Sequence, residues 1–136
     1  MGRIVASIDI QNVVQPDCAR QIDALVDTGA SHITLPSAWR DRFGSFAVEE
    51  AVDFETATLD IAAEIVCGPA RIQVEGFRVI HSEVLFVEMT PVDGEYEPLL
   101  GYIALEQCGA AVDLIGHRLL PVRHMDLKSA KPCASA

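Results

Sequence analysis

The sequence predicts an all-β, barrel-like domain with one or two short helices. Several runs alternate apolar and polar residues with the two-residue period of a half-buried strand, most clearly over residues 4–10, 20–26 and 52–66. Half of the 136 residues are hydrophobic but only 6% are aromatic, so we expect a core of mainly Val, Ile, Leu and Ala. Many short strands with only two helix-like segments favour a barrel.

The first half of the chain is interpreted as two hairpins around a short strand and helix. The runs 4–10 and 20–26 flank the turn residues Pro16-Asp17, which predicts an antiparallel hairpin. A short strand follows at residues 33–35, and Pro36-Ser37 opens a short helix that Gly44 ends. The alternating stretches within residues 52–66 predict the second hairpin, although its tip has no Gly or Pro.

The second half adds further strands and a second helix. Strands are expected at 70–80 and 83–89, an acidic loop from Pro91 to Pro98, a helix over 102–108, and two last strands around Gly116. We find no internal repeat and no domain boundary. The sequence therefore predicts one domain over residues 1–124, with residues 125–136 as a flexible C-terminal tail.

Charge and cysteine content exclude several kinds of partner. The formal net charge is −10, which disfavours nucleic acid and anionic membrane surfaces. The scattered cysteines have no C-x-x-C pair and no His at ligand spacing, so we expect no metal site and no cofactor. No signal-peptide-like segment and no run of 18 apolar residues occurs, which favours a cytoplasmic protein with reduced thiols.

One segment carries a candidate for chemistry. Asp27-Thr28-Gly29-Ala30-Ser31 follows the apolar residues 24–26 and precedes the strand at 33–35. An isolated Asp-x-Gly is most often only a turn whose carboxylate accepts backbone N–H bonds. Here a second motif, Leu99-Leu100-Gly101, comes later and directly precedes the expected helix. The two motifs together, in so short a chain, are a specific signal.

With these motifs the chain resembles the retropepsins, the single-domain aspartic peptidases of retroviruses, and especially their bacterial relatives, from about residue 4 to residue 122. The resemblance implies a retropepsin-like acid-protease barrel and an aspartic endopeptidase that acts on peptide or protein substrates as a homodimer. It implies a catalytic role for Asp27, Thr28 and Gly29. Thr28 would hydrogen-bond across the two-fold axis, and Gly29 would let the substrate backbone come close.

The resemblance also assigns residues around the catalytic loop. Substrate would contact Ala30 and Ser31 and the tip of a flap hairpin at Ala57, Thr58 and Leu59. Leu99, Leu100 and Gly101 would pack behind the loop and support it. Viral members commonly have Asp and Arg where this chain has Ser31 and Tyr102, so both partners of that ion pair are absent together.

The chemistry explains why a dimer is needed. Peptide hydrolysis without a metal requires a base for the water and an acid for the carbonyl. Two carboxylates at contact distance share one proton and can take both roles, and a two-fold axis beside Asp27 would bring two copies together. The chain contains the motif only once.

Other interpretations stay open. A flap without Gly favours a non-catalytic dimerisation or protein-binding module, since fold alone does not fix function. A monomeric precursor that dimerises only when concentrated or processed is a third interpretation. His32 could tune the motif, although we favour a packing or surface role for it.

Overall fold

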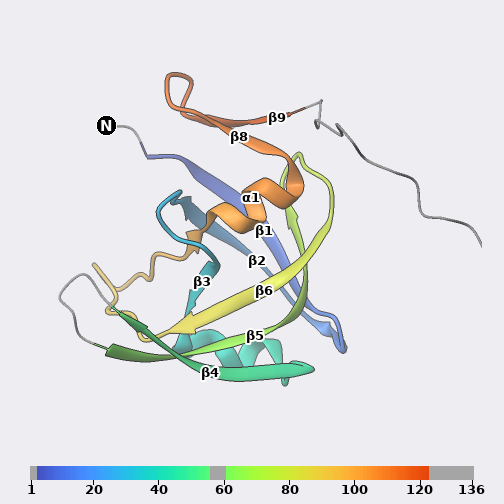
Figure 1. The fold of residues 1–136 in the computed structure, drawn as a ribbon, viewed down its shortest axis with the longest axis vertical. Coiled ribbons are helices and arrows are strands. Elements are labelled where there is room, and N and C mark those ends of the chain that lie inside the picture. The colour runs from blue at the N-terminus through green and yellow to red at the C-terminus, as the bar shows by residue number, and fades with distance from the viewer. Residues whose placement is uncertain (1–2, 56–60, 123–136) are drawn as a thin grey trace, which may run out of the picture.

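The computed structural model describes residues 3–55 and 61–122 (Figure 1). Its strands form a seven-stranded sheet that curves on itself and a separate two-stranded hairpin. The all-β prediction with one or two short helices is confirmed. The elements in chain order are β1 (Val5–Asn12), β2 (Gln15–Val26), β3 (Ile33–Pro36), the 3-10 helix η1 (Ser37–Phe43), β4 (Val48–Glu55), β5 (Ile61–Val74), β6 (Ile80–Val87), β7 (Leu99–Leu100), α1 (Tyr102–Cys108), β8 (Ala110–Asp113) and β9 (Arg118–Pro121).

The large sheet closes because β5 is long enough to serve two neighbours. The strand order is β1-β2-β7-β3-β6-β5-β4, and β1 also pairs with β5, so all strands except β4 form a closed ring. The second half of β5 pairs with β1 from Ala70 to Val74, and its first half pairs with β4. Closure of this kind removes most free sheet edges.

One strand was placed wrongly by the sequence pattern. The expected strand over residues 70–80 is instead the end of β5, and a turn at Gly76 separates it from β6. Gly76 has φ +89, a conformation that glycine adopts without strain. The apparent break at Gly68-Pro69 lies inside β5, because the pairing with β6 shifts register between Cys67 and Ala70 and such a bulge accommodates proline within a strand.

The core is aliphatic with one aromatic cluster. The side chains of Phe43, Phe46 and Phe86 lie with ring centroids 5.9–6.4 Å apart where η1 packs against the sheet. Buried Asn12 donates hydrogen bonds to the carbonyls of Phe43 (2.8 Å) and Ser45 (2.9 Å), so its amide ties β1 to the end of η1. The other fully buried large side chains are mostly aliphatic: Ile8, Ile10, Ile33, Leu35, Ile72, Val74, Val84 and Leu100.

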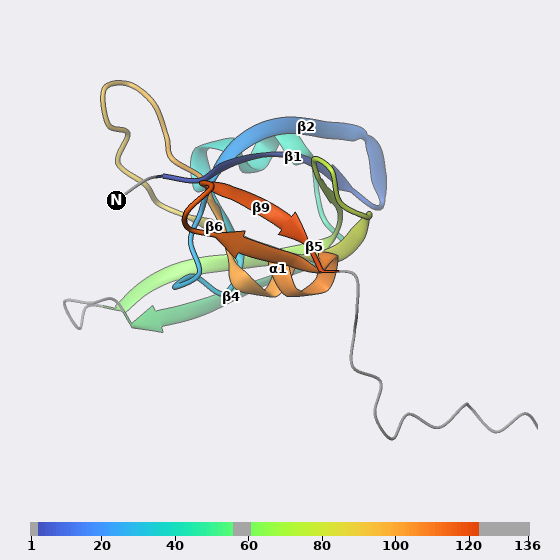
Figure 2. The same ribbon diagram turned by 90° about the horizontal axis from the view of Figure 1, so that it is seen from above.

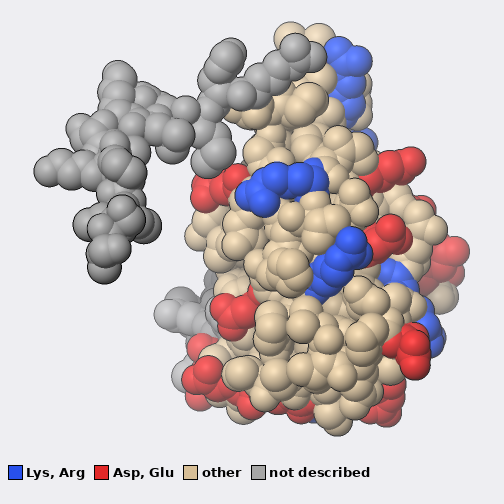
Figure 3. All heavy atoms as spheres, turned by 90° about the vertical axis from the view of Figure 1, so that its right-hand side faces the viewer, with Lys and Arg blue, Asp and Glu red and all other residues tan. Residues whose placement is uncertain are grey.

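The remaining elements lie around the ring. Hairpin β4–β5 extends from the body of the molecule (Figure 2). Strands β8 and β9 lie above α1, at the end of the molecule opposite β4 (Figure 1). Basic and acidic side chains are interspersed on the face that lies to the right in Figure 1 (Figure 3). Within the described residues, no helix has the length and apolar character needed to cross a membrane.

Candidate active site

Asp27, directly after the end of β2, is held by β7, a strand from a distant part of the sequence. Strand β7 runs parallel to β2, with Leu25 opposite Leu99 and Val26 opposite Leu100. The Leu25 N–H donates to the Pro98 carbonyl at 2.9 Å, and the Asp27 N–H donates to the Leu100 carbonyl at 3.0 Å. The backbone of Asp27 is therefore fixed by the Leu99-Leu100 segment.

The Asp27 loop is a tight turn that presents its carboxylate at the surface. The Ala30 N–H donates to the Asp27 carbonyl at 3.1 Å, and the Gly29 N–H donates to Asp27 Oδ1 at 2.9 Å. Asp27 is half-buried, whereas Thr28 and Gly29 are exposed. A Cβ at position 29 would lie 3.2 Å from Asp27 Oδ1, so glycine keeps this side of the carboxylate open.

Gly101 and the start of α1 hold the other side of the loop. The N–H groups of Tyr102 and Ile103 donate to the carbonyls of Ala30 (2.8 Å) and Ser31 (3.1 Å). These are N–H groups of the first helical turn, which have no partner within the helix. A Cβ at Gly101 would come within 2.5–2.7 Å of backbone atoms of residues 30–32, so no larger residue fits without moving the loop.

Ser31 and His32 form a pair beside the loop that the sequence did not predict. Ser31 Oγ lies 2.8 Å from His32 Nδ1, and both residues are half-buried. The His32 carbonyl accepts a bond from Thr34 Oγ1 at 3.1 Å, which ties the pair to β3. The imidazole thus contacts Ser31, a residue predicted to contact the substrate.

The structure describes the stem of the predicted flap hairpin. Strands β4 and β5 pair from Val48–Gly68 outward to Glu55–Ile61. The predicted substrate contacts Ala57, Thr58 and Leu59 fall between these strands and lie outside the described residues. Their role stays a prediction.

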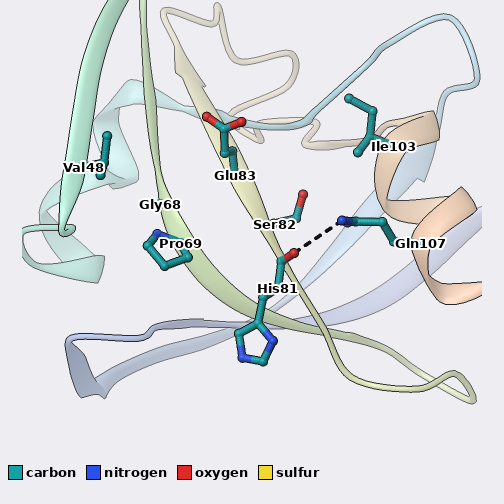
Figure 4. Close-up of a pocket in the computed structure, with 8 residues that line it drawn as sticks. All are labelled: Val48, Gly68, Pro69, His81, Ser82, Glu83, Ile103 and Gln107. Atoms are coloured by element: carbon teal, nitrogen blue, oxygen red, sulfur yellow. Dashed lines mark hydrogen bonds between the residues drawn. The ribbon is translucent and has the colours of Figure 1, made fainter. Parts of the chain in front are cut away.

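A cavity of about 420 Å³ lies between β4, β5, β6 and α1, and Asp27 does not line it (Figure 4). His81, Ser82 and Glu83 from β6 and Gln107 from α1 provide its polar groups, with Gln107 Nε2 donating to the His81 carbonyl at 3.4 Å. This cavity is therefore not part of the candidate site at Asp27.

A second cavity, of about 330 Å³, borders the strand that ends at Asp27. Asp23 and Leu25 of β2 line it together with the segment before β7. Asp23 was not singled out from the sequence, although it lies near the end of the strand that leads into Asp27 and on the face opposite the apolar residues 22, 24 and 26. Within the described residues, no group of three or more His, Cys, Asp or Glu side chains is placed to hold a metal ion.

A closed strand ring with a single Asp-Thr-Gly loop, supported from behind by a Leu-Leu-Gly segment and a short helix, defines the retropepsin-like aspartic peptidase fold. The chain belongs to the aspartyl protease family, whose model matches residues 12–103.

Solved structures agree with this fold. The protease of EIAV, in complex with an inhibitor, is similar with a TM-score of 0.61 at 19% identity, over 83% of this chain and 94% of that chain. The retroviral protease-like domain of Ddi1 from Leishmania major is similar with a TM-score of 0.53 at 14% identity, over 89% and 90% of the two chains. Among proteins with curated descriptions, none matches the sequence significantly.

Proposed function

We propose that the protein is an aspartic endopeptidase whose active site forms from two copies of Asp27, one from each subunit of a homodimer. The observation that supports this most directly is the single carboxylate at the surface, on a loop that both Leu100 and the start of α1 hold in place. A loop that only capped a turn would not need support from residues 100–103, which lie about seventy residues away in the sequence.

One Asp27 supplies half of the chemistry. In the dimer, the two carboxylates would lie side by side and share one proton, because two bare charges at contact distance repel strongly once water is excluded. The ionised carboxylate would take a proton from a bound water, and the protonated one would donate to the peptide carbonyl. Thr28 would join the two loops, and Gly29 would admit the substrate backbone.

The function is tested with Asp27→Asn, which keeps the size of the side chain and its bond from the Gly29 N–H. We expect peptide cleavage to be lost while the circular dichroism spectrum and the dimer remain. Asp17→Asn is the matched control, because Asp17 is an exposed carboxylate near the start of the same strand. Cleavage by Asp27→Asn at the wild-type rate would show that Asp27 is not the catalyst.

Dilution tests the shared site separately. Specific activity should fall as the subunits dissociate, because the site is an assembly that depends on concentration. Constant specific activity at concentrations where sizing detects only monomer would refute the two-subunit site.

A second candidate is a non-catalytic dimerisation or protein-binding module. The feature that favours it is the absence of Gly between Phe54 and Ile61, where the flap of a peptidase needs a mobile tip. An Asp27→Asn variant that keeps every measurable property of the wild type, with no cleavage by either protein, would favour this module.

A further inference from the structure

A cavity lies along the end of β2 that leads into Asp27, with Asp23 and Leu25 of that strand in its lining. Ile22, Ala24 and Val26 pack toward the core, so the alternate residues Asp23 and Leu25 point the other way, and Asp27 follows directly after the end of the strand. At the usual rise of a strand, Leu25 is about 7 Å and Asp23 about 13 Å along the chain from Asp27. The cavity thus has a lining residue, Leu25, two positions before the proposed catalytic residue.

Part of the cavity wall is apolar, and the loop that carries it is held in position. Val5, which is opposite Leu25 in the β1–β2 register, forms one side, and Tyr96 and Pro98 form the other. The Val92 and Glu95 backbones exchange hydrogen bonds of 2.9 and 3.0 Å, which fixes the loop before β7. The Tyr96 ring also packs edge-on against Trp39, with centroids 5.9 Å apart. A long aliphatic stem would find a preformed surface here.

The charges in the cavity leave an excess of carboxylates. Asp23, Glu95 and Glu97 line it together with one cation, Arg3. Arg3 forms an ion pair with Glu97, while Asp23 and Glu95 form none within residues 3–55 and 61–122. The pair places one guanidinium beside Glu97 and leaves Asp23 and Glu95 for a further cation.

We propose that this cavity binds a Lys or Arg side chain of the peptide substrate, close to the scissile bond. The inference rests on the proposed function and specifies its substrate. The stem of the side chain would lie on Val5, Leu25 and Pro98, as long cationic side chains commonly do on apolar surface. Its charged end would reach Asp23 and Glu95, where charge-assisted hydrogen bonds favour a cation over a neutral group.

The test is a panel of internally quenched peptides that differ at one position within three residues of the cleaved bond. Each position carries Lys, Arg, norleucine, Gln or Glu, so that norleucine matches the stem of Lys without its charge. For the wild type we expect kcat/KM about fivefold higher or more for Lys than for norleucine at one position, and lowest for Glu. The double variant Asp23→Asn, Glu95→Gln should lose this difference.

Two further variants test whether the charges of this cavity set the preference for Lys. Glu106→Gln removes an exposed carboxylate of α1 outside the cavity and should keep the wild-type ranking. Arg3→Gln releases Glu97 and should increase the preference for Lys. If the cavity instead used Arg3 to bind acidic side chains, the Glu peptide would rank first in the wild type, and that result would overturn the inference.

The outcomes also separate this inference from the proposed function. Cleavage without any ranking by charge would leave the peptidase in place and overturn the cationic site. If no peptide is cleaved, the proposed function fails, and the same panel carrying a fluorescent label is measured for binding to the wild type. Tighter binding of Lys than norleucine peptides, lost in the double variant, would then support the site, and binding without ranking or no binding would overturn it.

Discussion

Replacing Gly101 by Ala should both destabilise the protein and displace the Asp27 loop. The added Cβ would lie 2.5 Å from the His32 carbonyl oxygen, 2.6 Å from the Ser31 carbonyl carbon and 2.7 Å from the Ala30 carbonyl oxygen. All three are backbone atoms, so no side chain can turn aside to make room. Gly101 has φ −82, which alanine adopts easily, so the effect comes from the contact and not from backbone strain.

The expected cost is large for a domain of this size. Forcing one extra carbon into a close-packed site costs about 1–3 kcal/mol. Moving the loop away also weakens the bonds from Tyr102 and Ile103 to the Ala30 and Ser31 carbonyls, at about 1 kcal/mol each. The free energy of unfolding should therefore fall by about 3–5 kcal/mol, from a total that is typically about 5–15 kcal/mol.

Urea denaturation followed by the fluorescence of the single tryptophan, Trp39, measures the change. Wild type and variant are compared at one protein concentration, since dimerisation would shift the transition. Gly94→Ala is the control: it has open space around it but φ +77, so it reports the backbone cost alone, about 1 kcal/mol. A free energy of unfolding for Gly101→Ala within about 1 kcal/mol of wild type, with cleavage retained, would refute the argument.

Three other results are expected. Phe43→Ala should lower the free energy of unfolding by about 3–5 kcal/mol, because Phe43 is fully buried between Phe46 and Phe86, and a loss below 1 kcal/mol would contradict that packing. The hydrogen bond from the Gly116 N–H, together with Arg118 and the Ile115 N–H, lowers the pKa of Asp113 in the folded protein. The ionised Asp113 therefore stabilises the fold at any pH above its unfolded-state pKa, and this stabilisation is lost as the pH falls through its folded-state pKa. Asp113→Asn should therefore reduce the loss of stability in acid, and an unchanged stability profile against pH would count against these bonds. Burial raises the pKa of the Cys67 and Cys108 thiols, so a thiol reagent should modify Cys18 in the native protein and reach Cys67 and Cys108 only after unfolding, whereas fast native labelling of either would show an open core.

Local patterns in the sequence were sufficient for much of the fold. The alternation in β1, and Gly44 and Gly109 after the two helices, place these elements within a few residues of their observed bounds. The predicted turn at Pro16-Asp17 is wrong: both residues lie in β2, which begins at Gln15, and the hairpin turns at Val13-Val14, where no Gly or Pro marks it. The two motifs also identify the Asp27 loop and the segment behind it. Such information is local, because the period of a strand shows which face is buried but not which strand is its neighbour.

The features that the sequence missed depend on contacts between distant segments. The insertion of β7 between β2 and β3 joins backbones whose pairing no residue pattern records. The continuation of β5 through Gly68-Pro69 depends on a bulge opposite β6. The cavity beside Asp27 combines Arg3, Asp23 and Tyr96 from separate parts of the chain, so its chemistry becomes visible only in the folded molecule.

The pairing of β2 with β7 also has a consequence for how the protein matures. Leu25 and Leu99 are roughly seventy residues apart in sequence, and closing so long a loop is slow compared with forming the β1–β2 and β4–β5 hairpins. We therefore expect the backbone bond that fixes Asp27 to form after the hairpins during folding. If Asp27 is catalytic, as proposed, a partly folded chain that has its hairpins but no ordered carboxylate loop would be unable to cleave its neighbours.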